Sequence, residues 1–130
     1  MSEDSVKHIK SRGEFDALLN STRYVVADFY ADWCGPCKAI APHFLQFAST
    51  FSIPGYLAFA KVNVDNVDEV ARKYGVSAMP TFLFFKDGNQ VAVNGAPMIQ
   101  GANLPVLKQA VEKMGRLAKE KADAAASGSS

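Results

Sequence analysis

The sequence predicts an α/β domain in which helices cover both faces of a mixed central sheet. Strand-like and helix-like segments alternate along the chain in the order β-α-β-α-β-α-β-β-α, which is typical of a sheet between helical layers. A hairpin pattern near residue 88 breaks the alternation and predicts antiparallel pairing late in the sheet. The chain has 130 residues, enough for one domain with a sizeable core and no structural disulfides.

The first half of the chain predicts two strands and two helices. Residues 6–9 form a short candidate strand, and Ser11 and Glu14 have the spacing of a helix capping box. Residues 24–30 are mostly apolar without clean alternation, as expected of a strand covered on both faces. The second helix has a broad apolar stripe, and Pro42 within it is expected to bend it because proline removes a backbone donor.

The second half predicts three strands and two helices. Residues 57–64 form the next candidate strand, and a short amphipathic helix follows that Gly75 ends. Residues 81–85 and 90–93 flank a turn sequence and predict a hairpin. The last helix is expected to begin at Asn103, a favourable N-cap.

The chain divides at residue 118. We expect residues 1–118 to form the domain, and residues 119–130 to be a low-complexity tail that frays and then loses structure. This expectation rests on the run of Ala, Ser and Gly with which the sequence ends.

Composition excludes several classes of partner. The chain is 48% hydrophobic and 21% charged, with a formal net charge of +1, so it offers no electrostatic case for nucleic acid or an anionic membrane. Its apolar runs reach about five residues, far below the roughly 20 of a spanning helix. Glu3 and Asp4 stand where a signal peptide would be basic and then apolar, so we expect a cytoplasmic protein.

The two cysteines, Cys34 and Cys37, are the strongest chemical signal. They stand at the corner between the strand of residues 24–30 and the helix that follows, and a C-x-x-C pair at such a corner indicates redox chemistry. In the first turn of that helix, unpaired N–H groups and the helix dipole favour a thiolate on Cys34, the expected nucleophile. Cys37 lies about one turn further in and suits a resolving role.

Two other roles for the cysteines are less favoured. A structural disulfide between such near neighbours closes too small a loop to stabilise much. A zinc site needs further ligands, and neither His8 nor His43 completes a recognised spacing, so we expect no metal. Thiol–disulfide exchange is the preferred interpretation.

Several separated segments, in order, resemble one family. They are residues 26–38, 40–42, 61–65, 74–76, 78–82 and 101–103, the first of which contains Trp33-Cys34-Gly35-Pro36-Cys37-Lys38. Over residues 6 to about 116 the chain is similar to eukaryotic-type cytosolic thioredoxins. The resemblance implies the thioredoxin fold, with a central mixed five-stranded sheet flanked by four helices.

The resemblance also implies roles near the dithiol. Asp28 would be a buried carboxylate whose pKa rises through desolvation, so that it relays a proton to or from Cys37. Lys61, in the neighbouring strand, would tune Asp28 electrostatically. An exposed strand-edge acid and a solvated lysine remain the alternatives.

A shallow substrate groove follows from the same resemblance. It would be formed by Trp33, Gly35, Pro36, Met79, Pro80 and Gly101. Pro80 would follow a cis peptide bond, which would let the Met79 backbone pair with a substrate strand, and Gly101 would leave room for substrate. A core tryptophan, a trans proline that opens a strand and a helix-start glycine are the alternatives.

The implied function is reduction of protein disulfides. Thioredoxin reductase would re-reduce the dithiol with electrons from NADPH, no cofactor would be bound, and the protein would be a monomer. Implied clients are of the peroxiredoxin, ribonucleotide reductase and methionine sulfoxide reductase types. A disulfide isomerase or oxidase is disfavoured by Gly35-Pro36, where such enzymes have Gly-His, and a binding module without turnover remains an alternative.

One segment departs from the family pattern. Residues 89–100, between Gly88 and Gly101, are several more than the usual connection, and the excess falls in a turn-rich stretch at 94–97. We expect a longer final hairpin or a bulged loop beside Gly101.

Overall fold

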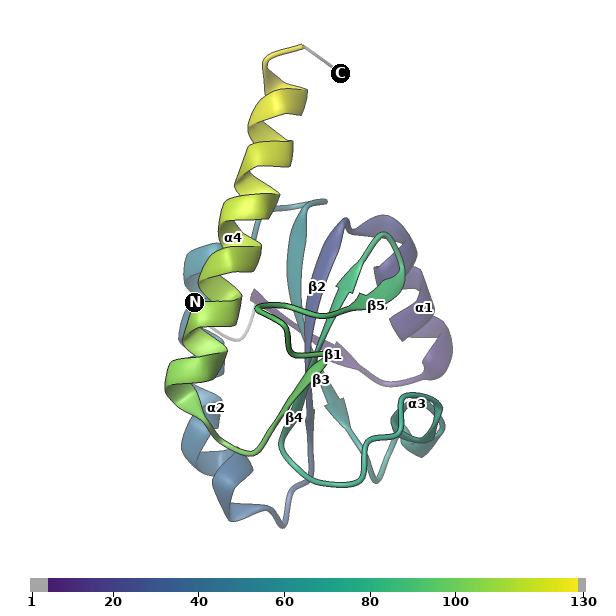
Figure 1. Ribbon diagram of the computed structural model, residues 1–130. Coiled ribbons are helices and arrows are strands. Elements are labelled where there is room, and N and C mark those ends of the chain that lie inside the picture. Colours follow the sequence, from purple (N-terminus) through teal and green to yellow (C-terminus); the bar gives the residue numbers. More distant parts are fainter. Residues whose placement is uncertain (1–4, 129–130) are drawn as a thin grey trace.

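The computed structural model describes residues 5–128 and places six strands and four helices in this part of the chain (Figure 1). In chain order the elements are β1 (Val6–Ile9), α1 (Arg12–Ser21), β2 (Tyr24–Tyr30), α2 (Gly35–Phe51), β3 (Leu57–Asn63), α3 (Asp68–Lys73), β4 (Thr81–Lys86), β5 (Asn89–Val91), β6 (Met98–Gln100) and α4 (Leu104–Ala126). Among the described residues, no helix is both long and apolar enough to cross a membrane.

The strands form one mixed sheet in the order β1-β3-β2-β4-β5, with β6 also paired to β4. β1 and β2 run parallel to β3 on its two sides, whereas β4 runs antiparallel to β2. β5 pairs with residues 84–86 of β4 and β6 with residues 81–83, so both lie along the same edge of β4. The prediction of a mixed sheet between four helices is confirmed, but the fifth position of the sheet is divided between two short strands.

The segment that divides them is a small hairpin. Val93 and Ala96 exchange both backbone hydrogen bonds, with N···O distances of 2.9 and 3.0 Å, around Asn94 and Gly95. Both turn residues have positive φ, 54° and 82°, as a two-residue type I′ turn requires. Where the sequence predicted a longer final hairpin or a bulged loop, the structure has a separate small hairpin between β5 and β6, and β5 ends at Val91 rather than at residue 93.

Two apolar layers cover the sheet. One face packs against α2 and α4 and the other against α1 and α3, as Figure 1 shows. Alternation along β2 sends Val26 to the first face and Val25 and Phe29 to the second, and all three side chains are fully buried. The prediction that β2 is covered on both faces is confirmed. By the same alternation, Asp28 lies on the face that α2 covers.

Side-chain caps begin three of the helices. The Ser11 hydroxyl accepts a hydrogen bond from the N–H of Glu14 at 3.1 Å, which confirms the predicted start of α1. Asn103 Oδ1 accepts from the N–H of Val106 at 3.3 Å and begins α4 where the sequence predicted. Cys34 caps α2, and Pro42 lies within that helix without ending it.

The end of α4 differs from the expectation. The helix continues to Ala126, although structure was predicted to be lost in the segment that starts at Lys119 (Figure 1). Alanine has the highest helix propensity, and Lys119 forms an i,i+4 ion pair with Asp123 at 3.0 Å. For these reasons the segment is helical although its sequence has low complexity. The domain boundary at residue 118 stays a prediction, and residues 1–4 and 129–130 lie outside the described residues.

We predict that Val93 anchors the inserted hairpin. Its side chain is 5% exposed and belongs to the core cluster beneath α4, so Val93→Ala should lower the free energy of unfolding by about 1–2 kcal/mol. The matched control is Val106→Ala, at a valine that is 41% exposed, where we expect a change within about 0.5 kcal/mol. Urea unfolding measures both, and equal losses would show that the hairpin is not held through Val93.

Candidate active site

The site begins where β2 ends. Residues 31–34 leave the sheet, and Cys34 then caps α2, with Cys37 in the first turn of that helix. The two cysteines form a disulfide, and their Cα atoms are 5.3 Å apart. Both side chains are buried, while Gly35 and Pro36 between them are exposed. The dithiol predicted from the sequence therefore lies at the molecular surface with only a narrow edge open to solvent.

The surroundings of Cys34 favour negative charge on its sulfur. The backbone N–H of Cys37 donates a hydrogen bond to Cys34 Sγ at 3.1 Å, and this N–H belongs to the first turn of α2. When the disulfide is reduced, the same N–H and the helix dipole stabilise a thiolate at Cys34. Cys34 Sγ also lies 3.6 Å from the carbonyl oxygen of Met79, which brings the 79–80 corner against the dithiol.

Asp28 is a buried acid on the α2 side of β2. Its residue is 1% exposed, and within the described residues its Oδ1 has no hydrogen-bond partner. Burial raises the pKa of Asp28 from 3.8 to about 7, and the positive charge of Lys61 partly opposes that rise. The alternative of an exposed acid at a strand edge is therefore wrong, because Asp28 lies in the middle of a strand paired on both sides.

Lys61 is placed beside this carboxylate by the strand register. It is the β3 partner of Asp28 in the parallel β2–β3 pair, and it is partly buried rather than freely solvated. Its Nζ lies 4.3 Å from the ring centroid of Tyr30. A cavity of about 330 Å³ is lined by Tyr30, Cys37 and Lys61 together with other residues of this corner. The sequence pointed to Lys61 but assigned no role to Tyr30.

Trp33 lies outside the core. The residue is 69% exposed, and its Nε1 donates a hydrogen bond to Asp65 Oδ2 at 3.0 Å. Asp65 is fixed in turn, because its N–H donates to Asn63 Oδ1 at 2.9 Å. The alternative of a core tryptophan is wrong, and the indole ring is held beside the dithiol by a carboxylate that the sequence did not single out.

Two distant segments that the sequence assigned to a substrate groove, at Met79–Pro80 and at Gly101, lie next to each other. The Met79–Pro80 peptide bond is cis, and the carbonyl of Pro80 accepts a hydrogen bond from the N–H of Gly101 at 2.8 Å. Gly101 has a φ of +90°, where glycine is strongly favoured, and a Cβ built there would meet no atom within 4 Å. Backbone conformation rather than crowding within the chain therefore requires glycine at this position.

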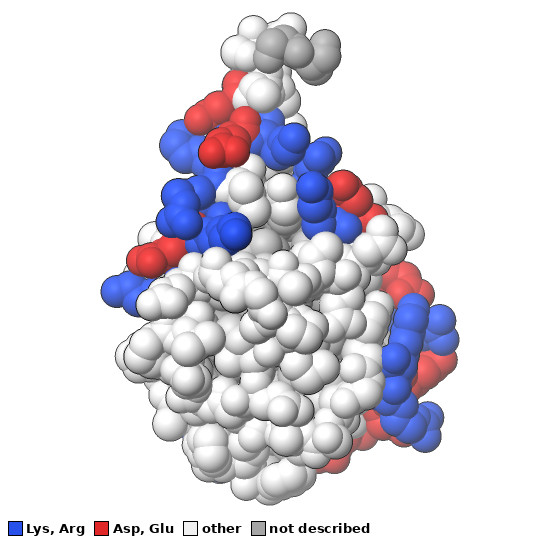
Figure 2. Space-filling model, viewed as in Figure 1, with Lys and Arg blue, Asp and Glu red and all other residues white. Residues whose placement is uncertain are grey.

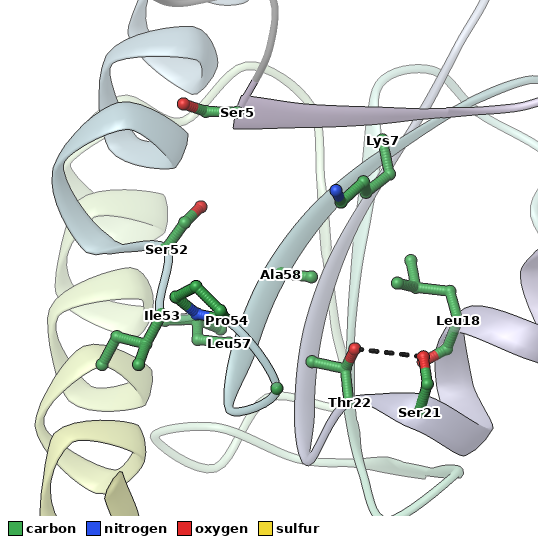
Figure 3. A pocket seen from close by; sticks show the side chains of 11 residues that line it. Ser5, Lys7, Leu18, Ser21, Thr22, Ser52, Ile53, Pro54, Leu57 and Ala58 are labelled. Carbon is green, nitrogen blue, oxygen red and sulfur yellow. Dashed lines mark hydrogen bonds between the residues drawn. The ribbon is translucent and has the colours of Figure 1, made fainter.

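A metal site and a second cleft are the other candidates for a functional site. The described residues contain no group of three or more His, Cys, Asp or Glu side chains arranged to hold a metal ion. A cleft of about 550 Å³ lies at the other end of β2 and β3, where Figure 3 shows Lys7, Ser52 and Thr22 around it. None of the residues predicted for the dithiol site lines this cleft.

Comparison with known proteins identifies the family. The thioredoxin family model matches residues 6–113. A thioredoxin of Neurospora crassa is 73% identical over 124 residues, which cover 95% of this chain and 98% of that protein. A thioredoxin-like protein of Fusarium culmorum is 57% identical over 116 residues, with coverage of 89% and 96%.

Solved structures agree with this match. Thioredoxin from Plasmodium falciparum superposes with a TM-score of 0.74 at 40% identity, covering 82% of this chain and 97% of that one. The chain belongs to the thioredoxin family. With Cys34 and Cys37 in a disulfide at the start of α2, it is a dithiol–disulfide oxidoreductase.

We predict that the burial of Asp28 makes stability depend on pH. The folded protein keeps the Asp28 proton up to about pH 7, whereas the unfolded chain loses it near pH 4. Folding therefore takes up a proton between these values, and the free energy of unfolding should fall as pH rises from about 4 to 7 and stay low above. Asp28→Asn removes the buried charge and should raise that free energy by about 2–4 kcal/mol at pH 8.

Urea unfolding of the oxidised protein between pH 4 and 9 measures this effect. Asp32→Asn is the matched control, because it removes an exposed carboxylate from the same corner and should change stability by no more than about 0.5 kcal/mol. An Asp28→Asn variant whose stability follows the pH profile of the unmodified protein would contradict the raised pKa.

Proposed function

We propose that the protein reduces disulfides in other proteins, with Cys34 as the nucleophile and Cys37 as the resolving thiol. The thiolate of Cys34 attacks one client sulfur, the client disulfide breaks, and one client sulfur leaves as a thiolate. Cys37 then loses its proton and attacks Cys34 Sγ. This second step forms the Cys34–Cys37 disulfide and releases the other client thiolate, so that two electrons pass to the client.

The observation that carries this assignment is the hydrogen bond from the Cys37 N–H to Cys34 Sγ. It stabilises charge on one sulfur of the pair, and the thiol with the more stable thiolate is the one that attacks. Cys34 also lies against Met79, in the groove where a client segment would pair with the backbone, whereas Cys37 lines the cavity on the side of Lys61.

Asp28 serves the second step in this proposal. Cys37 must be deprotonated before it attacks, and Asp28 is on the sheet face that α2 covers. A carboxylate whose pKa is about 7 accepts and returns a proton near neutral pH. Lys61 would moderate that pKa through its charge.

The proposed groove for client proteins is formed by Trp33, Gly35, Pro36, Met79, Pro80 and Gly101. One side of it adjoins a surface with few charges. The chain has no Asp, Glu, Lys or Arg between Asp87 and Lys108, and Figure 2 shows a broad uncharged surface below the charged turns of α4. We infer that client segments bind through apolar contacts and backbone pairing more than through ion pairs.

Electrons would come from NADPH through thioredoxin reductase, and this chain would bind no cofactor. The protein would act as a monomer in the cytoplasm. Family membership supports the reductase, and a related structure at 33% identity comes from work on a yeast mitochondrial 1-Cys peroxiredoxin and thioredoxin systems. Clients of the peroxiredoxin, ribonucleotide reductase and methionine sulfoxide reductase types are proposed on the same ground.

We predict that the protein couples NADPH oxidation to insulin reduction in the presence of a eukaryotic-type thioredoxin reductase. Absorbance at the NADPH band measures turnover, and Cys34→Ser should abolish it because the first attack is lost. No turnover by the unmodified protein, although its thiols exchange with a small disulfide, would contradict the proposed electron donor.

We also predict that the two cysteine variants differ in trapping. Cys37→Ser removes the resolving thiol and should accumulate mixed disulfides through Cys34 with an oxidised client, whereas Cys34→Ser should accumulate none. Non-reducing electrophoresis with mass spectrometry of the linked peptides detects them. Adducts formed by Cys34→Ser and not by Cys37→Ser would reverse the assignment of the nucleophile.

A further inference from the structure

Tyr30 is the last residue of β2 and lies two positions beyond Asp28, on the same face of the sheet. Its side chain is partly buried, and the Nζ of Lys61 stands 4.3 Å from the centroid of its ring. This distance is well within the range of a cation–π interaction, which strengthens as the pair loses contact with water. Tyr30 thus contacts the residue whose charge acts on Asp28.

Lys61 lines two cavities. One is the cavity of about 330 Å³ that it lines with Tyr30 and Cys37. A second cavity, of about 320 Å³, is lined by Tyr30 and Lys61 together with residues of β1 and of the β3–α3 region. Lysine has a long side chain with many rotamers, so a lysine that lines two cavities needs a contact to keep its ammonium group in one place.

We propose that Tyr30 is a positioning residue, whose ring holds the ammonium group of Lys61 beside Asp28 and the resolving cysteine. Without the ring, the ammonium group swings into either cavity and becomes fully hydrated, and its effect on Asp28 weakens with distance and screening. Tyr30 packs against the cluster that contains Cys34 and Cys37, but the proposed role involves no step on the client or on the sulfurs. It acts only through Lys61, and the role rests on the proposed proton transfer by Asp28.

Other charged groups surround this corner, and they stay unchanged in every variant of the test. Asp32 and Lys38 line the first cavity, and His8 and Lys10 line the second. On the other side of β2, the partner of Asp28 is Phe82, which carries no charge. Burial raises the pKa of the Tyr30 hydroxyl, which keeps the ring neutral and suited to bind a cation.

The test is an NMR titration of the Asp28 carboxyl carbon in the oxidised protein. Tyr30→Leu removes the aromatic face, and we expect the pKa of Asp28 to rise by about 0.5, because the Lys61 charge that lowers it has moved away. Tyr30→Phe keeps the face and should leave the titration near that of the unmodified protein. Lys61→Met should raise the pKa of Asp28 by at least as much as Tyr30→Leu.

The double variant Tyr30→Leu/Lys61→Met shows whether Tyr30 acts on the pKa of Asp28 by positioning Lys61 or directly. If Tyr30 acts through Lys61, the double variant titrates like Lys61→Met alone. Additive shifts, or an unchanged Asp28 titration in Tyr30→Leu, would overturn the proposal. Should Tyr30→Leu fail to fold, Tyr30→Met provides the same removal of the ring with an unbranched side chain of similar length.

The pH profile of insulin reduction is the second readout. Tyr30→Leu should move its Asp28-dependent limb in the same direction as the NMR titration. If the NMR shifts follow the expected order while the activity profile stays fixed, positioning by Tyr30 holds and the proton-transfer role of Asp28 fails. If the activity profile moves and the carboxyl titration does not, the positioning role fails.

Discussion

The burial of β2 is the constraint on which both fold and site depend. This strand pairs with β3 on one edge and β4 on the other, and helices cover both of its faces. The positions from Tyr24 to Phe29 are therefore buried, which suits valine and phenylalanine but isolates Asp28 from water. The same strand ends at the corner where Cys34 begins α2. The position of β2 thus determines both the burial of the Asp28 carboxylate and the placement of the Cys34 sulfur.

The chemistry of the corner depends on contacts between segments far apart in the chain. Met79 reaches Cys34, Gly101 binds Pro80, and Asp65 holds Trp33. Each contact comes from a loop at the end of a strand, and the sheet brings those ends together. The dithiol is therefore packed against Ala31 and the partly buried side chains of Tyr30, Val64 and Met79, and Cys37 lines the cavity that Lys61 shares.

Away from this corner, a small hairpin and a long last helix extend the fold. The hairpin around Asn94 and Gly95 enters at the outer edge of the sheet, where β5 and β6 each keep their pairing to β4. Val93 turns this hairpin inward and belongs to the core cluster beneath α4, so the hairpin contributes to the packing of the core. The last turns of α4 extend beyond the sheet and carry many of the charges seen in Figure 2.

The sequence by itself determined the order and kind of elements, the caps at Ser11 and Asn103, the buried strand of residues 24–30 and the dithiol. These follow from periodicity and spacing over a few residues, which local backbone geometry dictates. The extension of α4 to Ala126 is also local in origin, through alanine helix propensity and the Lys119–Asp123 ion pair, although the low complexity of the segment led to the opposite prediction. Only the tertiary structure decided the pairing of both β5 and β6 to β4, the Trp33–Asp65 hydrogen bond and the contact of Tyr30 with Lys61. Those features depend on which distant side chains the packed sheet brings within reach, and no local pattern encodes such distances.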